Sequence, residues 1–109
     1  MTTTANTYHK PHDVRRLEIL KAATKIAERV GVANVMRKDV AEKAKTAEGN
    51  INQIFLNMEN LKKEIMRYAI ETENLKLIVE GVILKNKIAL GAHPELRRKA
   101  FNHFATLQN

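Results

Sequence analysis

The chain has 109 residues, 44% of them hydrophobic and 28% charged, with a formal net charge of +7 at pH 7. This length and composition predict one globular domain and exclude a disordered chain or a second core. Cysteine is absent, which excludes disulfides and thiolate metal sites, and no segment resembles a secretory signal or a membrane span. We therefore expect a soluble cytoplasmic protein without membrane association, whose basic charge suits a polyanionic partner.

Residues 1–12 are rich in threonine and asparagine and show no periodicity, so we predict a flexible arm that ends near Pro11. Asp13 can cap a helix that runs to about Val30, where Gly31 closes it. Apolar residues recur every three or four positions along this helix and should face the core: Leu17, Leu20, Ala23, Ala27 and Val30. The linker 32–36 is rich in valine and is expected to tuck beneath the following helices.

The segment 37–55 has the pattern of a helix-turn-helix, and it is the most informative stretch of the chain. The inner faces of its two helices carry small and apolar residues, namely Val40, Ala41 and Ala44 in the first and Ile51, Ile54 and Phe55 in the second. The alanines matter because two steeply crossed helices cannot approach if bulky side chains stand between them. Such a unit usually enters the major groove of DNA.

The rest of the chain also predicts helices. Asn57 can cap a long helix whose inward positions are Leu61, Ile65, Tyr68 and Ala69. Residues 75–90 fit one helix, although their β-branched content also allows two short strands about Gly81. Gly91 and Pro94 indicate a helix end and a new start, followed by the inward positions Leu96, Ala100, Phe101 and Phe104. The prediction is an all-α fold of about six helices, with a head at 13–57 and a short helical body at 58–109.

The second helix of the helix-turn-helix, 48–55, has an outward face rich in amides. Stepping about 100° per residue from Ile51 places the candidate base-reading residues outward: Thr46, Gly49, Asn50, Asn52 and Gln53. Asparagine and glutamine can bond adenine through N6 and N7, and glycine permits a close backbone approach. Glu48 is expected at the side, where it can pair with Lys45 or Arg37.

Phosphate contacts are expected from basic residues around this helix, since each neutralised phosphate adds a salt-dependent contribution to affinity. The candidates are Lys10, Arg15, Arg16, Arg37, Lys38, Lys45, Lys62 and Lys63. An alternative for each is that it belongs to the solvated face of an amphipathic helix.

The body carries more apolar residues than one small core can hide, which predicts a dimer interface. Its candidate residues are Ile78, Ile83, Leu84, Ile88, Phe104 and Leu107. Neither a metal nor a cofactor is expected, because His9 and His12 beside Asp13 lack a fixed third ligand. No nucleophile or paired carboxylate framework is recognisable, so the sequence predicts a protein that is not an enzyme.

Residues 16–107 resemble the N-terminal part of the tetracycline-repressor-like (TetR) family of regulators. The residues that carry the resemblance are 19–31 (ILKAATKIAERVG), 39–44 (DVAEKA), Gly49, Ile51, Phe55, Glu59, Leu61 and 93–96 (HPEL). The resemblance implies a three-helix DNA-binding head, a connecting fourth helix and the start of a regulatory body. That body is short in this chain, so an inducer pocket of the family's kind, and hence a small-molecule effector, is not expected.

The chain departs from the family pattern at several positions in and around the turn. The family usually has glycine at Lys45, an aliphatic residue at Thr46, serine at Ala47, lysine or arginine at Glu48, tyrosine at Asn52 and Ile54, and lysine at Met58. Several of these positions contact phosphate in the family.

Two functions therefore remain open. One is a sequence-specific DNA-binding transcription regulator, most simply a repressor, that binds double-stranded DNA as a homodimer on half-sites about one helical turn apart. The other is a protein-interaction adaptor or anti-repressor on the same scaffold. By analogy of fold and size, a small regulator fits a bacterial, plasmid or phage origin and a place on the nucleoid.

Overall fold

The computed structural model describes the backbone of residues 12–108 and the side chains of residues 12–106. In this part of the chain the structure is entirely helical, as predicted. The elements are α2 (His12–Val30), the 3-10 turn η1 (Val32–Asn34), α3 (Arg37–Ala44), α4 (Glu48–Phe55), α5 (Met58–Glu71), α6 (Leu75–Ile83), α7 (Lys87–Leu90) and α8 (Pro94–Gln108). The predicted arm lies outside the described residues except for His12, which belongs to α2.

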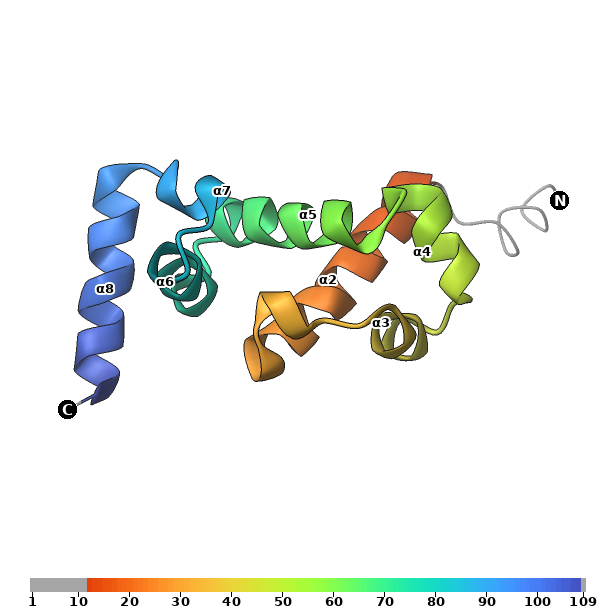
Figure 1. The fold of residues 1–109 in the computed structure, drawn as a ribbon, viewed down its shortest axis with the longest axis horizontal. Helices are drawn as coiled ribbons and strands as arrows, with labels where there is room; N and C mark the ends of the chain where they lie inside the picture. Colours follow the sequence, from red (N-terminus) through yellow and green to blue (C-terminus); the bar gives the residue numbers. More distant parts are fainter. Residues whose placement is uncertain (1–11, 109) are drawn as a thin grey trace, which may run out of the picture.

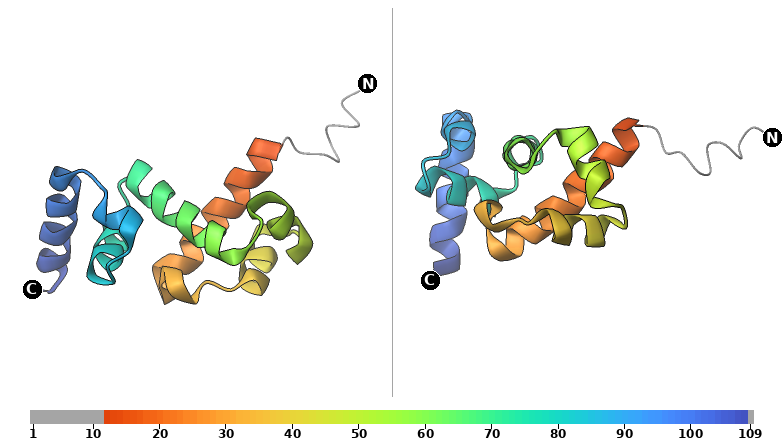
Figure 2. Two further views of the ribbon diagram at one scale, coloured as in Figure 1. Left: turned by 45° about the horizontal axis from the view of Figure 1, so that its top comes forward. Right: turned by 45° about the vertical axis from the view of Figure 1, so that its right-hand side comes forward.

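The helices form an elongated molecule of about 54 × 26 × 25 Å (Figure 1). Helices α2, α3 and α4 make the head at one end, and α5 runs from the head toward α6 and α7. Helix α8 lies across the opposite end, and both views in Figure 2 keep this order. None of the helices in residues 12–108 has the length and apolar character that a membrane crossing requires.

Helix α2 is buried over a broader face than the sequence predicted. Leu20, Ala23 and Ala27 are buried as expected, but Leu17 is 41% exposed and Val30 is 44% exposed. The additional buried residues are Ile19, Ala22, Thr24 and Ile26. The difference arises because α2 packs against α3 on one side and α5 on another, so a single stripe cannot describe its contacts. The helix begins at His12, and Asp13 lies in its first turn rather than at the cap.

The helix-turn-helix forms where it was predicted, with α3 and α4 joined by residues 45–47. Val40 and Ala41 are buried in α3, and Ile51 and Phe55 are buried in α4. Lys45 ends α3 in the left-handed conformation, with φ 57° and ψ 49°. Because a side chain destabilises this conformation, Lys45 occupies a position that favours glycine.

We expect Lys45→Gly to raise the free energy of unfolding by about 0.5 to 1 kcal/mol, since glycine removes the strain of a Cβ atom at positive φ. Urea denaturation measures the change. Lys45→Ala is the matched control, because it also removes the charge but keeps the Cβ atom. Equal stabilities of the glycine and alanine variants would contradict this account.

Helix α5 begins as predicted, because the side chain of Asn57 accepts a hydrogen bond of 2.8 Å from the backbone N–H of Asn60. Leu61, Ile65 and Ala69 of α5 are buried and Tyr68 is half-buried. Ile19 of the head, Leu61 of α5 and Leu77 of α6 all belong to one core cluster. The head and the body therefore share one apolar core.

Residues 75–90 are neither one helix nor two strands. Lys85 is left-handed, with φ 60°, and the side chain of Asn86 accepts hydrogen bonds from the N–H groups of Ile88 and Ala89. The break folds α7 back against α6, where a Cβ atom added to Gly81 would lie 2.6 Å from that of Ala89. The predicted single helix is therefore divided by an asparagine cap that the apolar periodicity did not reveal.

Helix α8 begins at Pro94 as predicted, but its inward face is narrower than expected. Ala100 is fully buried, Leu96 is half-buried, and Phe101 and Phe104 are 39% and 40% exposed. The reason is that α6 is the main neighbour of α8, so only a thin strip of α8 is covered. The prediction that both phenylalanines face the core is wrong.

Three hydrogen bonds from side chains of α6 and its cap Asn74 tie this helix to the head, one of them from Lys76 Nζ to the carbonyl oxygen of Glu28. Glu80 accepts a bond of 2.9 Å from the backbone N–H of Val32, and Asn74 donates one of 2.7 Å to Glu28. Glu28 lies near the C-terminal end of α2, and Val32 lies just beyond that end, in η1. The head is therefore held at a second point besides its covalent link through α5.

Candidate nucleic-acid interface

The outer face of α4 is the part of the head that carries the predicted base-reading residues. Ile51 is completely buried and Phe55 is 3% exposed, so these two side chains fix α4 on the core. Gly49 and Gln53 are exposed on the other side of the helix, as predicted. Apart from the adjoining residues and the backbone of α4, no heavy atom of the described residues lies within 4 Å of a Cβ atom placed on Gly49, so the backbone there is open to close approach.

Thr46 lies in the turn before α4, Asn50 lies in the first turn of α4, and the two side chains are joined to each other. Asn50 Nδ2 donates a hydrogen bond of 2.7 Å to Thr46 Oγ1. Arg15 Nη1, from α2, donates a second bond of 3.1 Å to the same oxygen. All three residues are half-buried. The sequence placed each of them at the interface but gave no sign of this contact, because Arg15 and Thr46 are separated by 31 residues.

Asn52 occupies a different environment from Gln53. Asn52 is half-buried, and its Oδ1 atom is shielded from solvent without a hydrogen-bond partner in the described part of the chain. A base contact through both amide groups requires an accessible oxygen. In this structure the Asn52 oxygen is not available for such a contact, and Gln53 is the exposed amide among the candidates Asn50, Asn52 and Gln53.

Three of the predicted phosphate contacts have partners within the protein, namely Arg15, which donates to Thr46, Arg16 and Lys62. Arg16 Nη2 forms an ion pair of 3.3 Å with Glu64, and its guanidinium lies 4.9 Å from the centre of the Phe55 ring. Lys62 Nζ donates a hydrogen bond of 2.9 Å to the carbonyl oxygen of Ala33. Arg16 and Lys62 thereby connect α5 to the head. The helical pattern of the sequence does not distinguish such a contact within the protein from a place at the surface.

The other basic candidates differ in their accessibility. Lys38, Lys45 and Lys63 are exposed, and Arg37 is half-buried with its Nε atom shielded and without a partner in residues 12–108. Lys10 lies outside the described residues. Glu48 is exposed rather than at the core flank, and within the described residues it pairs with neither Lys45 nor Arg37. Its charge lies in the first turn of α4, where a carboxylate stabilises the helix.

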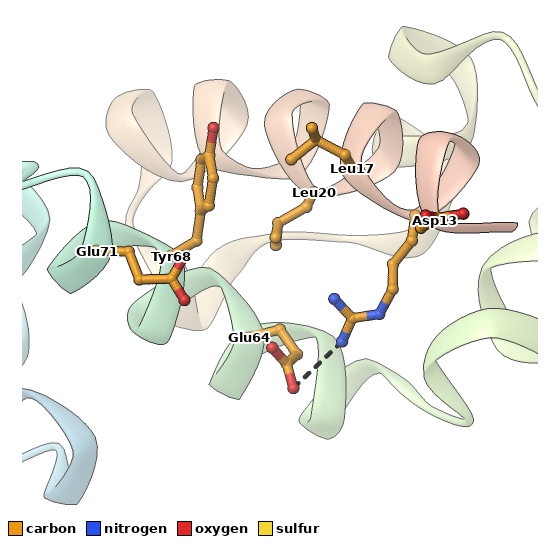
Figure 3. Close-up of a pocket in the computed structure, with 7 residues that line it drawn as sticks. Asp13, Leu17, Leu20, Glu64, Tyr68 and Glu71 are labelled. Atoms are coloured by element: carbon orange, nitrogen blue, oxygen red, sulfur yellow. Dashed lines mark ion pairs between the residues drawn. The ribbon is translucent and has the colours of Figure 1, made fainter. Parts of the chain in front are cut away.

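A groove of about 290 Å³ lies between α2 and α5, and Figure 3 shows the side chains that line it. Leu17, Leu20 and Tyr68 give it apolar walls, and the remaining lining residues are Asp13, Arg16, Glu64 and Glu71. The ion pair between Arg16 and Glu64 lies at this groove. Its three carboxylates outnumber its one cation, Arg16, so the groove is locally acidic and unfavourable for a phosphate group.

The predicted dimer interface is only partly available at the surface. Ile78 is completely buried in the core, so its assignment to an interface is wrong. Ile83, Leu84 and Phe104 are 55%, 64% and 40% exposed, and Ile88 is half-buried. The side chain of Leu107 lies outside the described residues. Ile78 differs from Ile83 because it belongs to the face of α6 that packs on the core cluster.

Comparisons of the chain with protein-family models, with curated proteins and with solved structures gave no match. The resemblance to the TetR family therefore remains a prediction that rests on the residues named above.

Proposed function

We propose that this protein is a sequence-specific DNA-binding transcription regulator that inserts α4 into the major groove. The observation that supports the proposal is the exposed pair Gly49 and Gln53 on the second helix of a helix-turn-helix. Buried Ile51 and Phe55 hold that helix from behind. A helix anchored in this way can enter the groove without exposing the core, as in other proteins of this architecture.

Charge supports the same proposal. The formal net charge is +7. Lys38 and Lys45 are exposed on the head, and Lys63 is exposed in the first half of α5. Lysines at such positions neutralise phosphates and release counterions, so the binding constant should fall steeply as salt rises. A second copy of the chain would pair through exposed Ile83, Leu84 and Phe104 and place two heads on neighbouring half-sites. Binding over a promoter would then repress transcription.

Selection of bound duplexes from a random library, followed by fluorescence anisotropy at several salt concentrations, tests this proposal. We expect enrichment of one motif that binds at least about a thousandfold more tightly than scrambled DNA at physiological salt. Weak binding that ignores sequence and disappears with salt would contradict it, because the charge would then act only as a general attraction.

The substitution Gln53→Ala is expected to weaken binding to the selected site by about 5-fold to 150-fold, equivalent to about 1 to 3 kcal/mol for one specific base contact. The melting temperature should not change, because Gln53 is exposed. Anisotropy and thermal denaturation measure the two effects. Asn102→Ala removes an exposed amide from α8 and serves as the control, for which wild-type binding is expected.

A protein-interaction adaptor is the second candidate function, and the exposure of Ile83 and Leu84 favours it. Exposed neighbouring aliphatic residues are typical of a binding surface. The two functions are distinguished by comparing Leu84→Asp with Gln53→Ala in a cellular reporter assay. The adaptor requires that Leu84→Asp abolishes activity while Gln53→Ala has no effect. The regulator requires that Gln53→Ala abolishes it as well.

A further inference from the structure

Thr46 joins α2 to the start of α4 through one hydroxyl oxygen. That oxygen accepts a hydrogen bond from Arg15 Nη1 at 3.1 Å and another from Asn50 Nδ2 at 2.7 Å. Arg15 comes from α2, whereas Asn50 stands in the first turn of α4. The three side chains therefore form a chain of contacts from the first helix of the head to the face proposed to meet DNA.

The hydrogen-bonding capacity of these groups limits what they can offer a base. A threonine hydroxyl has two lone pairs and one hydrogen. Both lone pairs of Thr46 accept hydrogen bonds in this arrangement, so the hydroxyl can only donate to a further partner. Asn50 uses one N–H on Thr46, which leaves its Oδ1 acceptor and one N–H for another group.

The contact also sets the orientation of the Asn50 amide. An asparagine amide that is free to turn can present either its oxygen or its nitrogen to a base, and it then distinguishes poorly between amino and keto groups. Because Nδ2 donates to Thr46, Oδ1 is the amide acceptor that is left for a base. A half-turn of the amide would break this bond, and the Thr46 hydroxyl would have to turn and donate to Oδ1 to replace it, which ends the arrangement in which Thr46 accepts from both Arg15 and Asn50.

We propose that Arg15 and Thr46 are positioning residues that hold Asn50 so that its Oδ1 accepts a hydrogen bond from an exocyclic amino group in the major groove. Adenine N6 and cytosine N4 are the two amino groups displayed there, whereas guanine and thymine display O6 and O4 at the corresponding places. The protein should therefore prefer adenine or cytosine over guanine or thymine at one position of the contacted strand. This inference rests on the proposed DNA-binding function.

The test uses four duplexes that differ only at the base pair under Asn50. That position is identified as the one where Asn50→Ala abolishes the preference. We expect the wild-type protein to bind the amino bases about tenfold more tightly than the keto bases. Thr46→Val, which lacks the hydroxyl, should reduce this ratio to less than about twofold. Thr46→Ser keeps the hydroxyl and should restore it.

Arg15→Lys separates positioning from charge. Lysine keeps the positive charge, so the salt dependence of binding should remain as in the wild type, while the amino preference should fall because the guanidinium bond to Thr46 is lost. A protein that selects no motif would overturn the proposed function. Two results would overturn this inference alone, provided that the wild-type protein selects a motif. One is that the Thr46→Val variant keeps the preference for amino bases, and the other is that the wild-type protein prefers a keto base under Asn50.

Discussion

Replacing Ile51 with alanine is expected to lower the free energy of unfolding by about 2 to 5 kcal/mol. Ile51 is completely buried and is one of the largest such side chains in the described part of the chain. The loss combines the transfer of apolar surface with a cavity that the surrounding core cannot close fully. Helix α4 depends strongly on this residue, because Ile51 and Phe55 are its two buried positions.

Urea denaturation followed by circular dichroism measures the effect of Ile51→Ala. Gln53→Ala in the same helix is the control, for which a change within about 0.5 kcal/mol is expected because the residue is exposed. A similar small loss for Ile51→Ala would contradict the packing described for α4. Comparison of the two variants also distinguishes an effect on stability from an effect on DNA recognition. Only Gln53→Ala should weaken DNA binding while the protein remains fully folded.

Gly81→Leu is expected to lower the free energy of unfolding by about 3 kcal/mol through overpacking. A Cβ atom at this position would lie 2.6 Å from Ala89 Cβ and 2.7 Å from Met66 Cε. The flexible end of Met66 can move away from the added atom. The Cβ atom of Ala89 can move only if the backbone of α7 moves, because alanine has no side-chain torsion that changes the position of Cβ. The substitution should therefore separate α7 from α6 despite the better helix propensity of leucine.

Gly49→Leu is the matched control, because it makes the same change in another helix where, among the described residues, no atom outside the adjoining backbone lies within 4 Å of the added Cβ atom. Its free energy of unfolding should stay the same or rise by up to about 1 kcal/mol. Thermal denaturation compares the two variants. Equal destabilisation of both would mean that glycine has no packing role at the contact between α6 and α7.

The sequence predicted the helix-turn-helix well because its pattern is local. Val40, Ala41, Ile51 and Phe55 are buried where the helical spacing placed them. The break at Asn86 was missed, since apolar periodicity continues through it and only the cap shows it. Exposure of Phe104 could not be predicted either, because it depends on how few neighbours α8 has.

The candidate interface was predicted as a set of residue types and not as a set of contacts. Exposure of Gly49 and Gln53 follows from their place opposite Ile51 on a short helix. In contrast, basic residues look alike in a sequence whether they face solvent or the protein. Arg16 binds Glu64 and lies over Phe55, and Arg15 binds Thr46. Such pairs depend on the tertiary fold, which brings distant segments together.

The attachment of α6 to the head bears on the operator that the proposed regulator would bind. Glu80 accepts a hydrogen bond from Val32, and Asn74 donates one to Glu28, so these bonds oppose rotation of the head about α5. In a dimer joined through α6 and α8, both copies of α4 would therefore keep a fixed separation and rotational phase. Each base pair inserted between half-sites turns one of them by roughly 35° about the DNA axis. An operator lengthened by a single base pair should therefore engage one head and lose the other.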